Sequence, residues 1–401
     1  MLTLLAGFVA LAAAPFSEDD DWTIKAEVVY PVSKAPIENG VVRVENGKIA
    51  AVGKGGGGNV LECAAVTPGM VDLSVQIDTG PASVEQSREA VVRLSVADAL
   101  DLFSFRWERE LRSGVTTALA NPLDMDVLGG FGVVVKTGGA PTPERRMLKA
   151  NAVLRGAIGT QPSSGNSAPR GLEPSSFYFR RPTTRMGVEW VARDAFYRAL
   201  QGVGSEDPAQ AEENALLKKV LAGEVVLMLQ AKATQDVRTA IYLKEEFGIP
   251  RVILDHAVEC WREPELLVRS GAAVVLPPFV PGGRHMDGYV PDSYFLPLDA
   301  AKQLSDLGVL FALSAHGGRE IGTRLSDQAG FAMRGGLSFE AALAAVTLTP
   351  ATLAGVADRV GSLEVGKDAD LVLWNGKPFE PTSRVIGVLL DGELVLDPRV
   401  R

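Results

Sequence analysis

Histidine is the side chain best suited to chemistry near neutral pH, and this 401-residue chain holds only His256, His285 and His316. His256 and His316 each follow a short apolar segment that is typical of a buried β-strand. In parallel α/β folds the carboxyl ends of the strands carry the active site. A catalytic zinc ion needs three protein ligands and an open position for water. Two imidazoles at strand ends therefore do not complete such a site alone.

Two interpretations fit these strand-end residues. In the first, His316 is a general base, and Asp255 or His256 orients it or contributes to a partial metal site. In the second, the same residues are hydrogen-bonded polar groups that line an inactive pocket. Ser314 stands two residues before His316, but no Gly-x-Ser-x-Gly turn surrounds it, so the sequence does not indicate a serine nucleophile. His285 lies in a Gly- and Pro-rich stretch and is predicted to be an exposed loop residue.

The elements that position these residues alternate between apolar strands and amphipathic helices, which indicates a parallel sheet built from βα units. Helical patterns cover residues 208–222, 235–247 and 298–307. The strand candidates number eight, as a closed (β/α)8 barrel requires. They are residues 70–75, 116–120, 132–135, 152–158, 225–229, 251–254, 273–276 and 310–313.

The sequence pattern at both ends of the chain indicates short strands separated by turns. Glu38-Asn39-Gly40, Glu45-Asn46-Gly47 and Asp391-Gly392 are hairpin signals. We therefore predict an α/β protein with a TIM-type barrel over residues 67–357. A small β-sandwich domain built from both termini, residues 22–66 and 358–401, accompanies it.

Residues 1–21 have the character of a signal peptide and linker, because a short apolar run ends in small residues and an acidic stretch follows. This predicts a periplasmic or secreted protein. The run lacks a basic residue near its start, so a buried N-terminal strand or a misplaced start codon in a cytoplasmic protein is the alternative.

The bulk composition excludes several classes of protein. A net charge of −9 and scattered basic residues argue against a nucleic-acid partner. Cys63 and Cys260 are too few for a disulfide framework or a zinc ribbon, and buried free thiols are expected. Arg180, Arg181 and Arg185 lie in an irregular insertion, where they either bind a carboxylate or, as we favour, form salt bridges on a solvated loop.

Several longer stretches together resemble the amidohydrolase superfamily, and they are most similar to its exported, imidazolonepropionase-like branch. They are residues 66–73 (VTPGMVDL), 114–117 (GVTT), 129–136 (GGFGVVVK) and 361–374 (GSLEVGKDADLVLW). The resemblance implies a metal-dependent hydrolase of carbon–nitrogen bonds, in small or cyclic amides, on a barrel.

Carried over by position, the resemblance shows substitutions at the ligands. The pair of histidines on the first strand falls on Ser74 and Gln76, and a later strand-end histidine falls on Gln230. Serine hydroxyls and glutamine amides are poor zinc ligands, but they retain hydrogen-bonding capacity. We therefore expect Ser74, Gln76 and Gln230 to contact a bound small molecule rather than a metal.

The remaining family positions are partly kept. The next ligand falls near Asp255-His256, which makes His256 the candidate metal ligand. The last-strand aspartate, a general base in the family, falls on His316, so His316 and Asp255 are the candidate catalytic residues. A bridging lysine falls on Arg155.

Because the first-strand pair is lost, we favour a non-catalytic protein with no cofactor, which binds a small molecule. We expect it to form a homo-oligomer or to pair with an active relative. The alternative is an active carbon–nitrogen hydrolase that uses one divalent metal, zinc, in a reduced site around Asp255, His256 and His316.

Overall fold

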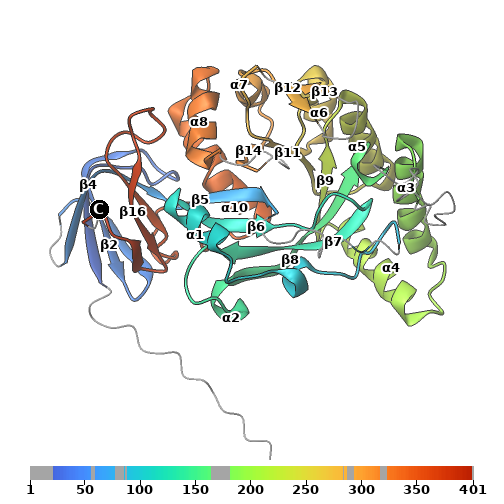
Figure 1. The fold of residues 1–401 in the computed structure, drawn as a ribbon, viewed down its shortest axis with the longest axis horizontal. Helices are drawn as coiled ribbons and strands as arrows, with labels where there is room; N and C mark the ends of the chain where they lie inside the picture. Colours follow the sequence, from blue (N-terminus) through green and yellow to red (C-terminus); the bar gives the residue numbers. More distant parts are fainter. Residues whose placement is uncertain are drawn as a thin grey trace, which may run out of the picture.

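The computed structural model describes residues 21–55, 59–76, 85, 88–163, 181–282, 284–286, 293–316 and 323–399. The predicted signal peptide, apart from its last residue, lies outside the described residues. Figure 1 shows a β-rich domain beside a larger body in which helices surround a second sheet. Among the described helices, none combines the length and apolarity needed to cross a membrane.

The β-rich domain is one seven-stranded sheet, which strands from both ends of the chain form as predicted. Its order is β17 (Glu393–Leu396), β16 (Val385–Leu390), β15 (Leu371–Trp374), β4 (Val60–Pro68), β1 (Trp22–Val29), β2 (Ile37–Glu45) and β3 (Lys48–Gly53). Ile24, Val42, Leu371 and Leu389 belong to one apolar core. A Cβ atom at Gly392 would lie 2.7 Å from Cα of Gly47, so the two outer hairpins meet and the sheet curls over its core.

Two of the three hairpin signals are confirmed. Asn46-Gly47 and Asp391-Gly392 have positive φ at both residues and join β2 to β3 and β16 to β17. The hairpin predicted at Glu38-Asn39-Gly40 is wrong, because these residues lie inside β2. Asn39 has a φ of 48°, so the Asn-Gly pair makes a local irregularity in the strand rather than a reversal of the chain.

All eight strands predicted for the barrel are present in a second sheet, which is nearly closed. Its order is β14 (Phe311–Leu313), β11 (Ala273–Leu276), β10 (Val252–Asp255), β9 (Val226–Ala231), β8 (Met147–Ile158), β7 (Leu128–Lys136), β6 (Val115–Ala120) and β5 (Met70–Val75). The prediction of an all-parallel sheet is wrong for one strand. β7 pairs antiparallel with both β6 and β8, so a meander replaces one βα unit.

Helices pack on the outside of this sheet, including the three that the sequence predicts. Those three are α4 (Pro208–Leu221), α5 (Thr234–Phe247) and α7 (Ala300–Asp306). The other described helices are α1 (Phe105–Arg112), α2 (Pro143–Arg146), α3 (Arg185–Gln201), α6 (Pro264–Ser270), α8 (Leu325–Arg334), α9 (Phe339–Ala345) and α10 (Leu348–Ala354), with 3-10 turns at Val96–Ala99, Gln161–Ser163 and Cys260–Arg262. His285 lies in β12 (Arg284–Met286), which pairs with β13 (Ser293–Phe295) instead of forming the predicted loop.

A buried lysine joins the two domains. Lys136, the last residue of β7, is 1% exposed, and its Nζ atom lies 2.6 Å from Asp370, 3.0 Å from Asp368 and 3.0 Å from Asp391. Burial disfavours the ammonium charge, but the three carboxylates outweigh it and raise the pKa of Lys136 above its ordinary value. The aspartates of the GKDAD segment thus hold the β-rich domain against the barrel.

Candidate functional site

Ser74, Asp255 and His256 form one buried hydrogen-bonded group where β5 and β10 end. Ser74 Oγ donates to Asp255 Oδ2 at 2.7 Å and lies 3.3 Å from Nδ1 of His256. The same Nδ1 atom lies 2.8 Å from Asp255 Oδ2. His256 has a φ of 48°, a left-handed conformation that turns its ring back toward the residue before it.

Both ring nitrogens of His256 face oxygen acceptors. Nδ1 faces the Asp255 carboxylate, and Nε2 lies 2.8 Å from the backbone carbonyl oxygen of His316. A carbonyl oxygen only accepts, so Nε2 donates to it, while Nδ1 is held against the Asp255 carboxylate. His256 therefore binds protein oxygens on both sides.

Arg155 lies at the centre of the site, in β8. Its Nε atom donates to Asp124 Oδ1 at 2.7 Å, and its Nη2 atom lies 2.6 Å from Asp255 Oδ2. The Asp124 carboxylate also accepts from the side-chain amides of Gln230 at 2.6 Å and Gln76 at 3.0 Å. The structure thus brings Gln76 and Gln230 together on a protein carboxylate.

Opposite charges in this group are in direct contact. Burial opposes ionisation of Asp255, but the guanidinium of Arg155 and the ring of His256 outweigh it and hold the pKa of this carboxyl well below its usual range. Burial likewise disfavours the charge of Arg155, yet Asp124 and Asp255 raise its pKa. The site is therefore a charged network with one fixed cation between two carboxylates.

His316 lies at the edge of this network rather than inside it. Its Nε2 atom is 3.6 Å from Oε2 of Glu110 in α1, a distance for an ion pair but too long for a hydrogen bond. Burial lowers the pKa of His316, but the carboxylates of Glu110 and Asp72 more than offset this and raise it above its ordinary value. The imidazoles of His256 and His316 thus have separate partners and do not converge on one point.

Asp72 bridges β5 and the end of β14, two strands between which no backbone ladder is found. Its carboxylate accepts from Ser314 Oγ at 2.7 Å, from the Ala315 backbone amide at 2.8 Å and from the Ser74 amide at 3.0 Å. Asp72, through its hydrogen bonds with Ser314 and Ala315, therefore holds the barrel together at its seam.

We expect Asp72→Asn to lower the free energy of unfolding by about 1–3 kcal/mol, since an amide replaces a buried carboxylate that accepts three hydrogen bonds. Urea denaturation measures this loss. Ser314→Ala, which removes one of the three bonds, should give a smaller loss, and an equal or larger loss would contradict the assignment of the seam to Asp72.

The donor atoms at the family positions do not fit a metal centre of the expected type. The available groups are the hydroxyl of Ser74 and the side-chain amides of Gln76 and Gln230. Each donates a hydrogen bond to a carboxylate of the protein. Oδ1 of Asp255 is buried and accepts no hydrogen bond from the described residues, yet the Arg155 guanidinium is in contact with the same carboxylate. In the part of the chain that the structure describes, no three His, Cys, Asp or Glu side chains are grouped to hold a metal ion.

Asp124, Glu110 and Asp72 are residues of the site that sequence reasoning missed. Asp124 follows β6 within a short loop, at the same end of the barrel as Gln76 and Gln230, and this position was the available signal. Glu110 is carried by a helix and shows no motif. Asp72 lies in the VDL segment, which contributes to the family resemblance but gives no separate signal for the role of this aspartate.

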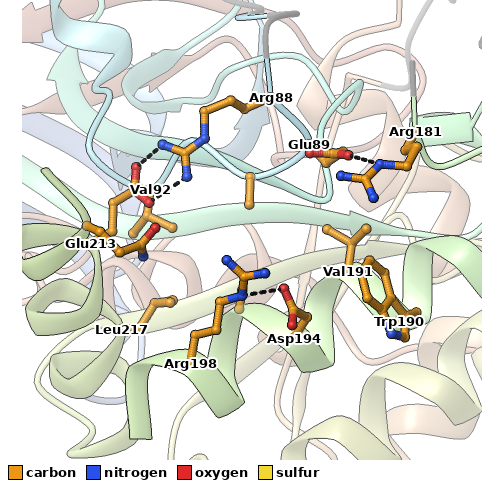
Figure 2. Close-up of a pocket in the computed structure, with 13 residues that line it drawn as sticks. Arg88, Glu89, Val92, Arg181, Trp190, Val191, Asp194, Arg198, Glu213 and Leu217 are labelled. Atoms are coloured by element: carbon orange, nitrogen blue, oxygen red, sulfur yellow. Dashed lines mark hydrogen bonds and ion pairs between the residues drawn. The ribbon is translucent and has the colours of Figure 1, made fainter. Parts of the chain in front are cut away.

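A second group of charges lies on the outer wall of the barrel, in a cavity of about 280 Å³ beside α3 and α4. Figure 2 shows its arginines already paired with acids of the protein. Arg88 binds Glu213 through two hydrogen bonds, and Arg181 Nε lies 2.8 Å from Glu89. The Arg181–Glu89 pair is of the kind that the salt-bridge interpretation of the insertion predicts. Arg180 lies outside the described residues.

The comparisons with known proteins agree with this fold. The model of the amidohydrolase family matches residues 298–395. The chain is 28% identical over 309 residues to the amidohydrolase tasK of Hapsidospora irregularis, a match that covers 72% of this chain and 31% of that protein. The chain therefore spans about a third of the length of this curated relative.

Solved structures extend the similarity to nearly the whole chain. An amidohydrolase from Thermotoga maritima MSB8 is 28% identical, with a TM-score of 0.80 over 94% of this chain and all of that one. An adenosine deaminase from Xanthomonas campestris with bound zinc is 19% identical, with a TM-score of 0.54 over 94% of this chain and 93% of that one, and shows the shared fold alone. Together with the geometry above, these matches place the chain in the amidohydrolase superfamily.

Proposed function

We propose that this protein is a metal-independent, non-catalytic member of its superfamily, which works by binding a small molecule or a partner chain. The observation that carries the proposal is the buried Arg155 guanidinium, which contacts both Asp124 and Asp255. A guanidinium is charged throughout the physiological pH range. It therefore supplies permanently, from within the chain, the positive charge that a metal ion would supply.

The cation has a second consequence for metal binding. A divalent ion near Asp255 would lie next to Arg155, and in a buried site the repulsion between like charges is weakly screened. Displacing Arg155 would also leave a buried guanidinium without its carboxylates, which is strongly unfavourable. Both effects oppose binding of a metal at this end of the barrel.

The alternative, a carbon–nitrogen hydrolase built on Asp255, His256 and His316, has weaker support. A general base needs an unprotonated nitrogen within hydrogen-bond reach of the water or group that it activates. His256 faces acceptors with both nitrogens, and the His316 ring faces Glu110. We therefore place these residues in the structural network and not in a reaction.

Elemental analysis tests the proposal. We expect zinc, iron, manganese, cobalt and nickel each to be far below one equivalent in protein purified without a metal-affinity step. The melting temperature should not change after dialysis against a chelator. His256→Ala serves as the control, since it removes the retained family imidazole. Close to one equivalent of any of these metals in the parent chain, lost in His256→Ala, would overturn the proposal and direct attention to amide substrates.

A further inference from the structure

A cavity of about 660 Å³ lies where the barrel meets the β-rich domain, and its size is that of a small-molecule site. It is lined by α1, by the start of α8 and by the segment that leads into β16. In Figure 1 the α1 helix lies between the two domains, beside β16. The inner wall of the cavity includes Glu110, the residue that faces His316. The cavity thus adjoins the polar network but is separate from it.

Arginines dominate the charge of this cavity. Four line it, Arg109, Arg112, Arg324 and Arg384, against three acids, Glu108, Glu110 and Asp327. Two of the acids are already engaged, because Glu108 lies 2.7 Å from Arg112 and Glu110 faces His316. This leaves more positive charge than the cavity itself neutralises.

Arg324 and Arg384 carry that excess. No ion pair or side-chain hydrogen bond joins either guanidinium to a described residue, whereas the arginines of the cavity in Figure 2 are paired with acids. A guanidinium presents a planar set of donors that matches a carboxylate in two parallel hydrogen bonds. The two arginines therefore offer the donors that an anionic group requires.

The other groups in the cavity narrow the class of ligand. The hydroxyl of Ser383 is buried on this wall and has no hydrogen-bond partner among the described residues. Phe105, at the start of α1, is 77% exposed and lines the same cavity, and Val385 adds a second apolar surface. An uncovered aromatic ring beside unpaired guanidinium groups favours a ligand with an apolar part and an anionic end.

We propose that this interdomain cavity binds a small organic carboxylate, with its carboxylate on Arg324 and Arg384 and its apolar part against Phe105. The buried Ser383 hydroxyl supplies one more polar contact. The inference goes beyond the metal-independent role proposed above and does not depend on it, since none of these residues belongs to the Arg155 network.

Isothermal titration calorimetry of the full chain with phenylacetate tests the proposal, with phenylacetamide as the uncharged analogue. We expect saturable binding of phenylacetate in the range of ~0.1–1 mM and no comparable binding of phenylacetamide. Arg324→Gln and Arg384→Gln should each weaken binding about tenfold, since each removes a charge-assisted contact. Arg251→Gln is the matched control, because Arg251 is also exposed but lies outside the cavity, and it should leave binding unchanged.

Three results would overturn the proposal. They are equal binding of phenylacetamide, unchanged affinity in both arginine variants, and no saturable binding of phenylacetate up to about 10 mM. Two further measurements distinguish a site for organic carboxylates from a site for any anion. They are binding of phenylacetate to Phe105→Ala and binding of inorganic phosphate to the parent chain. We expect Phe105→Ala to weaken the binding of phenylacetate several-fold. If phosphate binds with equal affinity and Phe105→Ala has no effect, the site does not select organic carboxylates.

Discussion

Arg155→Met is expected to lower the free energy of unfolding by about 3–5 kcal/mol, because it leaves the buried carboxylates of Asp124 and Asp255 without their cation. The methionine side chain keeps much of the apolar volume, so the loss reports mainly on charge. Urea denaturation followed by circular dichroism measures it. The matched control is Arg181→Met, which breaks an ion pair of similar length whose arginine side chain is 70% exposed, and it should cost less than about 1 kcal/mol.

The pH dependence of this loss distinguishes charge from packing. In the parent chain the pKa of Asp255 is depressed, so its contribution to stability is present above the unfolded pKa of about 4 and is lost as the pH falls through the folded pKa. Without Arg155, burial raises the pKa of Asp255 instead. Lowering the pH from about 7 to 5 should then protonate it and narrow the difference in stability between variant and parent. A gap that does not change with pH would indicate a packing defect.

A rescue experiment tests whether Arg155 acts by neutralising the carboxylates of Asp124 and Asp255. Adding Asp124→Asn and Asp255→Asn to Arg155→Met removes the two uncompensated charges, so the triple variant should recover part of the lost stability. If the triple variant is less stable than Arg155→Met, the guanidinium is not acting by neutralising these two residues.

The strands of the barrel could be predicted from the sequence, because each is a continuous apolar run buried on both faces. The direction of β7 was not predicted, since an apolar run is the same in either direction. The length of a connection does carry that information. Only residues 121–127 separate β6 from β7, and a parallel crossover needs a dozen or more residues. The short loop required an antiparallel pair.

The site was predictable only in part, for a related reason. The positions of Ser74, Gln76, Gln230 and Asp255 follow from strand ends, which apolar patterns locate. The partners do not follow, because Asp124, which binds Gln76 and Gln230, comes from a loop, and Glu110, which faces His316, comes from a helix. A sequence pattern also cannot show that Arg155 points inward between two carboxylates. The substitutions at the family's ligand positions were therefore visible in the sequence, and the contacts of Arg155 with two carboxylates were not.

Lys136→Met is expected to lower the free energy of unfolding by about 3–5 kcal/mol, because it removes the buried cation at the junction of the two domains. Asp368 and Asp370 are almost fully buried, and Lys136 is the buried cation that contacts both. Without Lys136, the buried carboxylates of Asp368 and Asp370 would lie close together and lose the buried cation that contacts both. Their repulsion favours separation of the β-rich domain from the barrel, or protonation of one aspartate.

Lys48→Met is a closely matched control, since Lys48 Nζ lies 2.5 Å from the same Asp368 but its side chain is 49% exposed. It should cost less than about 1 kcal/mol, because water can replace an exposed ammonium. Unfolding is best followed with two probes, tryptophan fluorescence and limited proteolysis with mapped cleavage sites. If Lys136 couples the domains, Lys136→Met should expose cleavage sites in the β-rich domain before the barrel unfolds. Equal losses for Lys136→Met and Lys48→Met would mean that burial of the ammonium group does not determine its contribution.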